Sequence, residues 1–141
     1  MSDTASPYTG SRIDHLNVAV PDLDRSIAFY SRVLEVIGIE TKLHVPARPD
    51  LPEMHGFGVG GKPFFWLIAD GTVGTNMHVA FTVGSRDLVR RFYDTALAAG
   101  ATPLHSPAAW TEYHPDYYGG FVLDPDGINL EAVCHEPADR S

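Results

Sequence analysis

The sequence predicts an α+β fold made of two copies of one βαβββ unit. Aligning His15 with His78 brings the segments Ile13–Val20 and Asn76–Val83 into one register, 63 residues apart. Three further landmarks repeat at the same spacing or after a one-residue slip: Phe29–Tyr30 with Phe92–Tyr93, Leu34 with Leu97, and Gly38 with Gly100. Self-similarity at a fixed spacing indicates an internal duplication. Strand, helix and turn patterns follow one another in the same order in both copies.

The first segment of each copy alternates in polarity, as a strand with one buried face does. In the first copy, one face carries Leu16, Val18 and Val20, and the other carries His15, Asn17 and Ala19. In the second copy, Val79, Phe81 and Val83 oppose His78, Ala80 and Thr82. The bulky apolar faces should pack under the helices, so both histidines are predicted to point away from them.

A helix is predicted after each of these strands. Asp22 or Asp24 can cap the first helix, and Ser85 or Asp87 the second. Apolar residues then recur at helical spacing: Ile27, Tyr30, Val33, Leu34 and Ile37 in the first helix, and Leu88, Phe92, Ala96 and Leu97 in the second. Gly38 and Gly100 follow where a helix C-terminus favours a residue that tolerates positive φ.

Extended segments separated by turns complete each unit. The predicted strands are Glu40–Val45, Gly56–Gly58 and Pro63–Ala69, then Thr102–His105, Gly119–Leu123 and Ile128–Val133. Hairpin turns are predicted at Gly60–Pro63 and Asp124–Gly127, and loops at Arg48–Pro52 and Pro107–Pro115. We therefore expect a single domain over residues 11–136, with module one at 11–72 and module two at 73–136. Residues 1–10 and 137–141 are expected to be flexible tails.

Composition excludes several classes of function. The net charge of −8 argues against a nucleic-acid partner, because phosphate contacts need clustered Lys and Arg. No stretch approaches the roughly 20 apolar residues of a membrane helix, and the N-terminal residues lack the pattern of a secretory signal. The single cysteine, Cys134, fits a reducing compartment. A cytoplasmic protein with small-molecule partners is the expectation.

Several motifs give the chain a clear resemblance to a known superfamily. They are His15 and His78 opening equivalent strands, Val20–Ser26 followed by Phe29–Tyr30, and Phe121–Gly127 running into Leu130–Glu131. The chain resembles the vicinal oxygen chelate superfamily, which includes glyoxalase I, extradiol dioxygenases, fosfomycin-resistance enzymes and bleomycin-binding proteins. The resemblance extends from about Arg12 to His135. It implies a glyoxalase-like fold in which two modules form an incomplete barrel around a concave cavity, and a homodimer.

In metal-binding members of the superfamily, the ligands come from the first and last strands of each module. Strand parity independently places Glu131 with Asn129 and Val133 on the face away from the helices. Two imidazoles and one carboxylate suit a divalent ion such as Zn, Ni, Co, Mn or Fe. We therefore predict that His15, His78 and Glu131 converge on a metal. The alternative is that the two histidines are ordinary half-buried side chains inherited through the duplication.

One ligand of the glyoxalase I pattern is missing. The resemblance places a second carboxylate at position 66, 67 or 68, where this chain has Trp66, Leu67 and Ile68. With Glu131 as the only carboxylate, another group would have to act as a base, and His114 has a suitable ordinary pKa. The predicted catalytic residues are Glu131 and His114, unless the aromatic loop that carries His114 merely packs over the cavity. The predicted substrate pocket comprises Asn17, Trp66, Phe81, Trp110, Tyr113, Tyr117, Tyr118 and Asn129.

Four functions compete on these grounds. The resemblance favours a metal-dependent lyase or isomerase similar to lactoylglutathione lyase, acting on a small oxygenated substrate through a metal-bound enediolate. An Fe(II) extradiol-type dioxygenase would use the same His–His–Glu set, but most such enzymes are about twice as long. A fosfomycin-type transferase also uses that set, but the chain has no convincing loop for potassium or a phosphonate. The fourth is a non-catalytic drug-binding protein with an apolar ligand against Trp66, Phe81, Trp110 and Tyr118.

Overall fold

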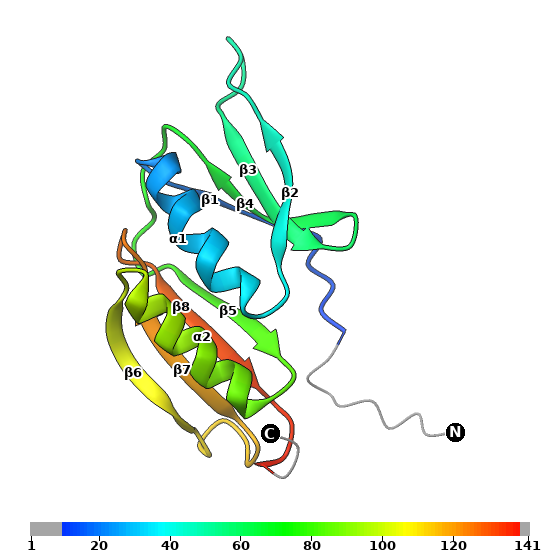
Figure 1. The fold of residues 1–141 in the computed structure, drawn as a ribbon, viewed down its shortest axis with the longest axis vertical. Coiled ribbons are helices and arrows are strands. Elements are labelled where there is room, and N and C mark those ends of the chain that lie inside the picture. Colours follow the sequence, from blue (N-terminus) through cyan, green and yellow to red (C-terminus); the bar gives the residue numbers. More distant parts are fainter. Residues whose placement is uncertain (1–9, 139–141) are drawn as a thin grey trace.

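A computed structural model of the chain describes residues 10–138, so residues 1–9 and 139–141 of the predicted tails lie outside the described residues. Figure 1 shows the two modules following one another along the chain. Module one contains β1 (Leu16–Ala19), α1 (Leu23–Glu35), β2 (Glu40–Val45), β3 (Met54–Val59) and β4 (Lys62–Ile68). Module two contains β5 (His78–Val83), α2 (Arg86–Ala98), β6 (Thr102–Ala109), β7 (Tyr118–Leu123) and β8 (Asn129–Cys134). The predicted repeat of βαβββ units is confirmed.

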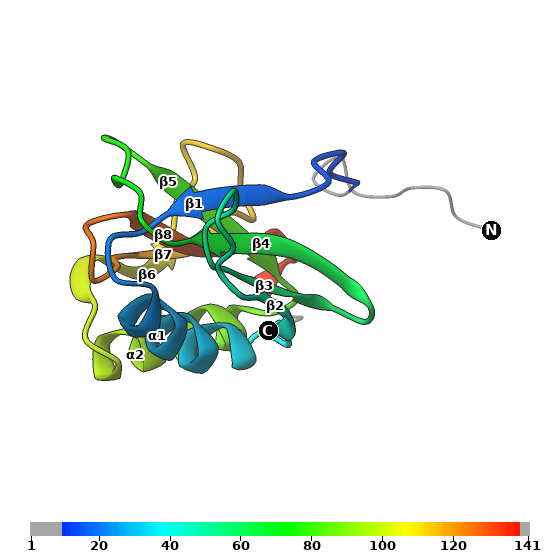
Figure 2. The same ribbon diagram turned by 90° about the horizontal axis from the view of Figure 1, so that it is seen from above.

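Each module forms its own four-stranded sheet, with strand orders β1-β4-β3-β2 and β5-β8-β7-β6. The first and last strands of each module pair in parallel, and the other neighbours pair antiparallel. Both helices cover the same side of the two sheets, as the view in Figure 2 shows. The opposite side of each sheet is not covered by a helix. We call these two uncovered surfaces the open faces.

The local signals in the sequence explain most element boundaries. Asp22 and Ser85 cap the two helices by accepting hydrogen bonds from the backbone N–H groups of Arg25 and Leu88. Gly38 and Gly100 end the helical segments with φ values of 80° and 109°, which favour glycine over residues with a side chain. In β6 the structure differs from prediction: the strand runs to Ala109 and takes in part of the predicted loop Pro107–Pro115. Its prolines are tolerated because β6 is an edge strand with register shifts against β7.

The core lies between the helices and the sheets and continues from one module to the other. Val18 and Val20 of module one are 2% and 0% exposed, and Val79 and Phe81 of module two are both 8% exposed. The Phe65 and Phe81 rings meet across the modules with centroids 5.3 Å apart. The predicted parity of both first strands is therefore confirmed. No helix of the described residues is long and apolar enough to cross a membrane.

The turn between β7 and β8 fastens module two to helix α1. The Tyr30 hydroxyl of α1 donates to Asp124 Oδ2 at 2.5 Å, while Asp124 Oδ1 accepts from the backbone N–H groups of Asp126 at 2.8 Å and Ile128 at 2.9 Å. Burial, reinforced by the Asp124 carboxylate, raises the pKa of Tyr30, so its hydroxyl remains a donor. Arg25 adds an ion pair to Asp126. This turn thus joins module two to α1 through a buried carboxylate.

The two sheets stay separate, and the chain by itself forms no closed barrel. With the helices packed side by side and the β7–β8 turn held against α1, the open faces lie next to each other instead of facing across an enclosed cavity. The α+β glyoxalase-like class is confirmed. The cavity predicted between the two modules is not enclosed by one chain.

Candidate metal centre

The open face of module two holds an imidazole and a carboxylate in direct contact. His78 opens β5, and Glu131 lies on the neighbouring strand β8, directly opposite Ala80. The Nε2–H of His78 donates to Glu131 Oε1 at 2.9 Å. The side chain of Glu131 is 1% exposed, whereas that of His78 is 46% exposed. The buried Glu131 carboxylate is thus hydrogen-bonded to an imidazole that is half exposed to solvent.

The second oxygen of the Glu131 carboxylate is held by Tyr117. The Tyr117 hydroxyl donates to Glu131 Oε2, and both burial and this carboxylate raise the pKa of Tyr117. Burial also raises the pKa of Glu131, although the hydrogen bonds from Tyr117 and His78 oppose that shift. Gly119 makes room for the contact, because a Cβ there would lie 2.8 Å from Glu131 Oε2. The carboxylate is therefore fixed from two sides.

His15 lies on the other open face, in module one. Its Nδ1–H donates to Asp14 at 2.7 Å, and Lys62 Nζ approaches the same carboxylate at 2.5 Å. Lys62 first and His15 second lower the pKa of Asp14. A hollow of about 370 Å³ beside them is also lined by Trp66 and Met54. Sequence reasoning did not single out Asp14, although its position next to His15 was the available signal.

The predicted convergence of His15, His78 and Glu131 does not occur within one chain. Residues 10–138 contain no group of three or more His, Cys, Asp or Glu side chains placed to hold a metal ion. The structure brings His78 to Glu131 but leaves His15 with Asp14. The reason is the arrangement of the modules, since each open face belongs to a separate sheet. His15 and His78 thus each lie on an open face, but the two faces belong to different sheets and do not form one cavity.

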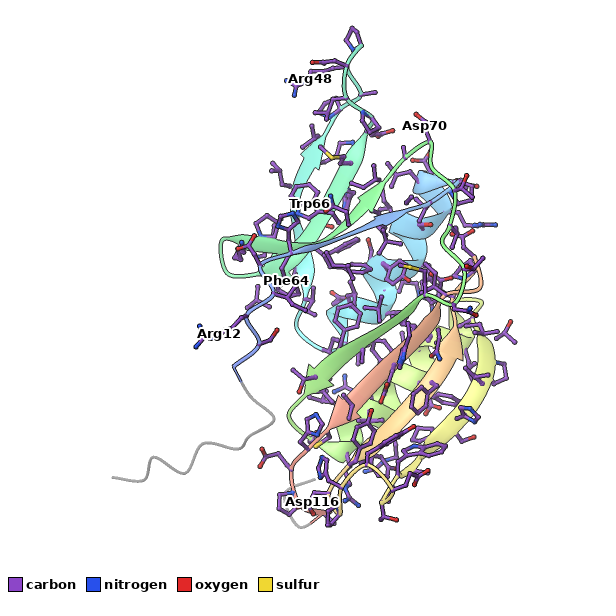
Figure 3. The ribbon with its side chains drawn as sticks, turned by 180° about the vertical axis from the view of Figure 1, so that it is seen from behind. Arg12, Arg48, Phe64, Trp66, Asp70 and Asp116 are labelled. Carbon is purple, nitrogen blue, oxygen red and sulfur yellow. The ribbon has the colours of Figure 1, made fainter. Side chains whose placement is uncertain are left out.

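Trp66 is the structural counterpart of Glu131. Trp66 of β4 lies opposite Asn17 of β1, just as Glu131 lies opposite Ala80, and Asn17 and Ala80 are equivalent in the repeat. Within the predicted window 66–68, position 66 is therefore the one equivalent to Glu131. The indole lies over Gly56 of β3, where a Cβ would come within 2.9 Å of three ring atoms. Figure 3 shows Trp66 and Phe64 side by side on this face.

The loop after β6 brings other predicted residues to module two. The ring of Trp110 packs on Phe121 with centroids 5.5 Å apart, and its indole N–H donates to the Gly119 carbonyl at 3.0 Å. Tyr113 is 60% exposed and contacts the ring of Tyr117. His114 Nε2–H donates to His135 Nδ1 at 2.8 Å, because the backbone N–H of Asp116 occupies its Nδ1. His114 therefore lies against the ring of Tyr117, with centroids 5.6 Å apart.

Two predicted pocket residues lie on the helix side of their strands. Phe81 packs into the core against Phe65 and Phe92, with only its edge at the groove between the modules. Tyr118 lies under Arg86 and Arg90 of α2. Both placements differ from the predicted pocket, and for Phe81 the strand alternation already indicated it. Asn17 and Asn129 do lie on open faces, in the same alternation as His15 and Glu131.

Comparison with known proteins identifies the family. The model of the glyoxalase/bleomycin resistance protein/dioxygenase superfamily matches residues 12–132. The chain belongs to this superfamily. No curated protein matches it.

Solved structures of other members of this superfamily share the fold. A glyoxalase/bleomycin resistance protein from Albidiferax ferrireducens T118 is 22% identical, with a TM-score of 0.72 over 88% of this chain and 99% of its own. A glyoxalase/bleomycin resistance protein/dioxygenase family enzyme from Burkholderia phytofirmans PsJN is 20% identical, with a TM-score of 0.66 over 89% and 100%. Glyoxalase I from Zea mays is 21% identical, with a TM-score of 0.68 over 89% of this chain and 45% of its own. At these identities the likeness supports the fold alone.

Proposed function

We propose that the protein is a metal-dependent lyase or isomerase that acts on a small oxygenated substrate. In this proposal a homodimer holds the ion between His15 of one chain and His78 with Glu131 of the other. The observation that carries it is the 2.9 Å contact between His78 Nε2 and the buried Glu131 carboxylate. Members of the superfamily commonly use divalent metals and often dimerise.

The donor atoms in module two fit a metal ion. Two adjacent ligands of an octahedrally coordinated ion, each about 2.0–2.2 Å from it, stand about 3 Å apart. His78 Nε2 and Glu131 Oε1 already have that separation, and the proton between them would have to leave when an ion binds. A carboxylate that is 1% exposed is unfavourable without a compensating partner. Imidazole and carboxylate together suit Zn, Ni, Co, Mn or Fe(II).

His15 has the outer partner that a metal-binding histidine usually has. Its Nδ1–H is held by Asp14, so the ring is oriented with Nε2 available for a ligand role. A groove of about 460 Å³ beside it contains the exposed apolar side chains of Ile13, Leu16 and Val59. A second copy that covers this groove would bury apolar surface and bring an open face of its own to His15. This is the basis for a composite site.

When bound, the ion would act as a Lewis acid that polarises a substrate oxygen. Glu131 Oε1 would have to leave the ion before it could accept a proton from the substrate carbon, and burial favours the protonated carboxyl that results. Tyr117 would keep Oε2 in place, and Trp66 would form an apolar wall that limits water. We propose that His114 positions Tyr117 instead of acting as the base, because its Nε2–H is directed at His135.

Mixing two inactive variants tests the composite site. His15→Ala should remove one half of the site and His78→Ala the other, so each homodimer should lose metal measured by elemental analysis after purification without added metal. Random mixing after refolding makes half of the dimers hybrids, each with one intact site, and should restore about a quarter of the wild-type sites. Mixing His15→Ala with wild-type protein provides the assembly control.

No recovery in the mixture, with hybrid dimers demonstrated, would contradict the shared site. Equal metal content in wild type and His78→Ala would contradict the metal centre altogether. The identity of the ion then separates the enzyme classes. Zinc, nickel or cobalt supports the lyase or isomerase, whereas oxygen-sensitive iron would favour an extradiol-type dioxygenase.

Trp66 supports a second candidate, a non-catalytic small-molecule binding protein. It replaces a ligand by an aromatic surface next to Met54 and Pro63, which suits an apolar ligand. This function predicts that aromatic compounds quench tryptophan fluorescence in wild type but much less in Trp66→Leu, regardless of metal content. Binding that instead requires His78 would favour the metal enzyme.

A further inference from the structure

One hydrogen-bonded chain joins four side chains of module one: Thr41 and His44 of β2, His55 of β3, and Glu53, which immediately precedes β3. His44 Nε2–H donates to Glu53 at 2.9 Å, and His44 Nδ1 lies 3.0 Å from His55 Nδ1. His55 Nε2 is 2.8 Å from the Thr41 hydroxyl. Each imidazole thus has its outer nitrogen held by an oxygen group, while the two inner nitrogens point at each other.

The strand geometry explains how these groups share a face. His44 and His55 are directly opposite each other in the antiparallel pair β2–β3. Thr41 and His44 are three positions apart and would point to opposite faces of a regular strand. The register shifts between Thr41 and Leu43, and the extra residue of this bulge turns both side chains toward His55. Neither histidine has a counterpart in module two, so the duplication does not account for them.

We propose that His44 and His55 form a second divalent-metal site, in which both Nδ1 atoms bind one ion. Imidazole ligands select a borderline transition metal such as Zn²⁺, Ni²⁺ or Cu²⁺ over Mg²⁺ or Ca²⁺. Two nitrogens bound tetrahedrally to zinc stand about 3.3 Å apart, so the observed 3.0 Å requires an adjustment of about 0.3 Å. Water fills the remaining coordination positions, since two protein ligands are available.

The outer partners are those that such a site requires. Glu53 keeps the His44 proton on Nε2, which leaves Nδ1 with its lone pair. For binding, the His55 proton moves from Nδ1 to Nε2 and is donated to Thr41, whose hydroxyl turns to accept it. No proton is lost from the neutral array. The Glu53 carboxylate also offsets the charge of the ion, and the bound ion would join β2 to β3 next to the connection at residues 46–53.

The experiment uses the full chain carrying His78→Ala, so that the first proposed centre cannot contribute. Isothermal titration with Zn²⁺ or Ni²⁺ should show one equivalent bound per chain. In that background His44→Gln should weaken binding by at least tenfold, and Glu53→Gln by about 10–100-fold, as loss of an outer partner does. His105→Gln, a strand histidine of module two, is the matched control and should leave the affinity unchanged.

Because His55 is 7% exposed whereas the His44 side chain is 41% exposed, His44→Gln is the decisive variant, with its fold checked by circular dichroism. Nitrogen-15 imidazole spectra should show the metal on Nδ1 of both rings, and His55 Nε2 should change to the signal of a protonated nitrogen as it takes the proton from Nδ1. The proposal is overturned if the His78→Ala protein binds no equivalent, if His44→Gln binds as tightly, or if the shifts fall on other histidines. Failure of the first proposed centre would be seen in a different measurement: the metal content of the wild-type protein and of His78→Ala would be the same.

Discussion

The two modules share a topology but differ in what their open faces carry. In module one the large side chain is Trp66 on the last strand, and its cross-strand neighbour is Gly56. In module two the arrangement is reversed, with Glu131 on the last strand opposite Phe121. Each pair keeps one large aromatic ring, while only module two keeps a carboxylate. The two copies have therefore diverged: module one has an apolar open face and module two an open face with a candidate ligand. Each pair still contains one aromatic side chain.

The turns before the last strands differ as well. Module two has Asp124–Gly127, whose first carboxylate receives Tyr30 of α1, whereas module one has Gly60–Gly61, which has no carboxylate to offer. Tyr93 is the repeat counterpart of Tyr30. Of these two equivalent tyrosines, Tyr30 is the one that bonds Asp124 of the other module. We call this hydrogen bond the tie between the modules. Three predictions test these differences.

The largest expected effect comes from breaking the tie between the modules. Asp124→Ala would remove three hydrogen bonds to a buried carboxylate and leave the Tyr30 hydroxyl unsatisfied. We expect a loss of about 3–5 kcal/mol in the free energy of unfolding, measured by urea denaturation. Tyr30→Phe removes one of these bonds and should cost about 1–2 kcal/mol.

Tyr93→Phe, at the equivalent position of module two, is the matched control and should cost less than Tyr30→Phe. Equal losses at the two tyrosines would show that the tie is not specific to the Asp124 turn. A loss below about 1 kcal/mol for Asp124→Ala would mean that apolar packing between the modules, such as Phe65 on Phe81, fixes them without the turn.

An intermediate effect is expected from adding one methyl group to either open face. Gly119→Ala would place a Cβ 2.8 Å from Glu131 Oε2, and Gly56→Ala would place one 2.9 Å from the Trp66 ring. Both substitutions should destabilise the fold by about 1–3 kcal/mol through overpacking. Only Gly119→Ala should reduce retained metal, because only there does the displaced side chain carry a ligand. Equal metal content in the two variants would remove the functional difference between the faces.

Local features of the fold could be predicted from the sequence, whereas the contacts between modules could not. Alternation placed Val18 and Val79 toward the helices and His15 and His78 away from them, because side-chain direction in a strand depends only on position. The relation of His15 to His78 depends instead on how two finished sheets pack, and the decisive contact joins Tyr30 to Asp124 across 94 residues. The Tyr117 bond to Glu131 likewise depends on a loop path that no periodicity specifies.

The smallest effect is expected from a substitution that makes module one resemble module two. It is also the most direct test of the comparison. Trp66→Glu would put a carboxylate at the position equivalent to Glu131, on the strand next to His15. Within the proposed dimer it supplies a fourth ligand, and we expect metal affinity to rise by at least about tenfold in a competition titration with a chelator. Removing the indole uncovers Gly56, so the metal-free protein should be less stable by about 1–2 kcal/mol. Trp66→Gln has a similar shape without the charge and should show the stability loss alone. If both variants bind metal as wild type does, position 66 does not face the ion, and the proposed placement of one open face against the other in the dimer is wrong.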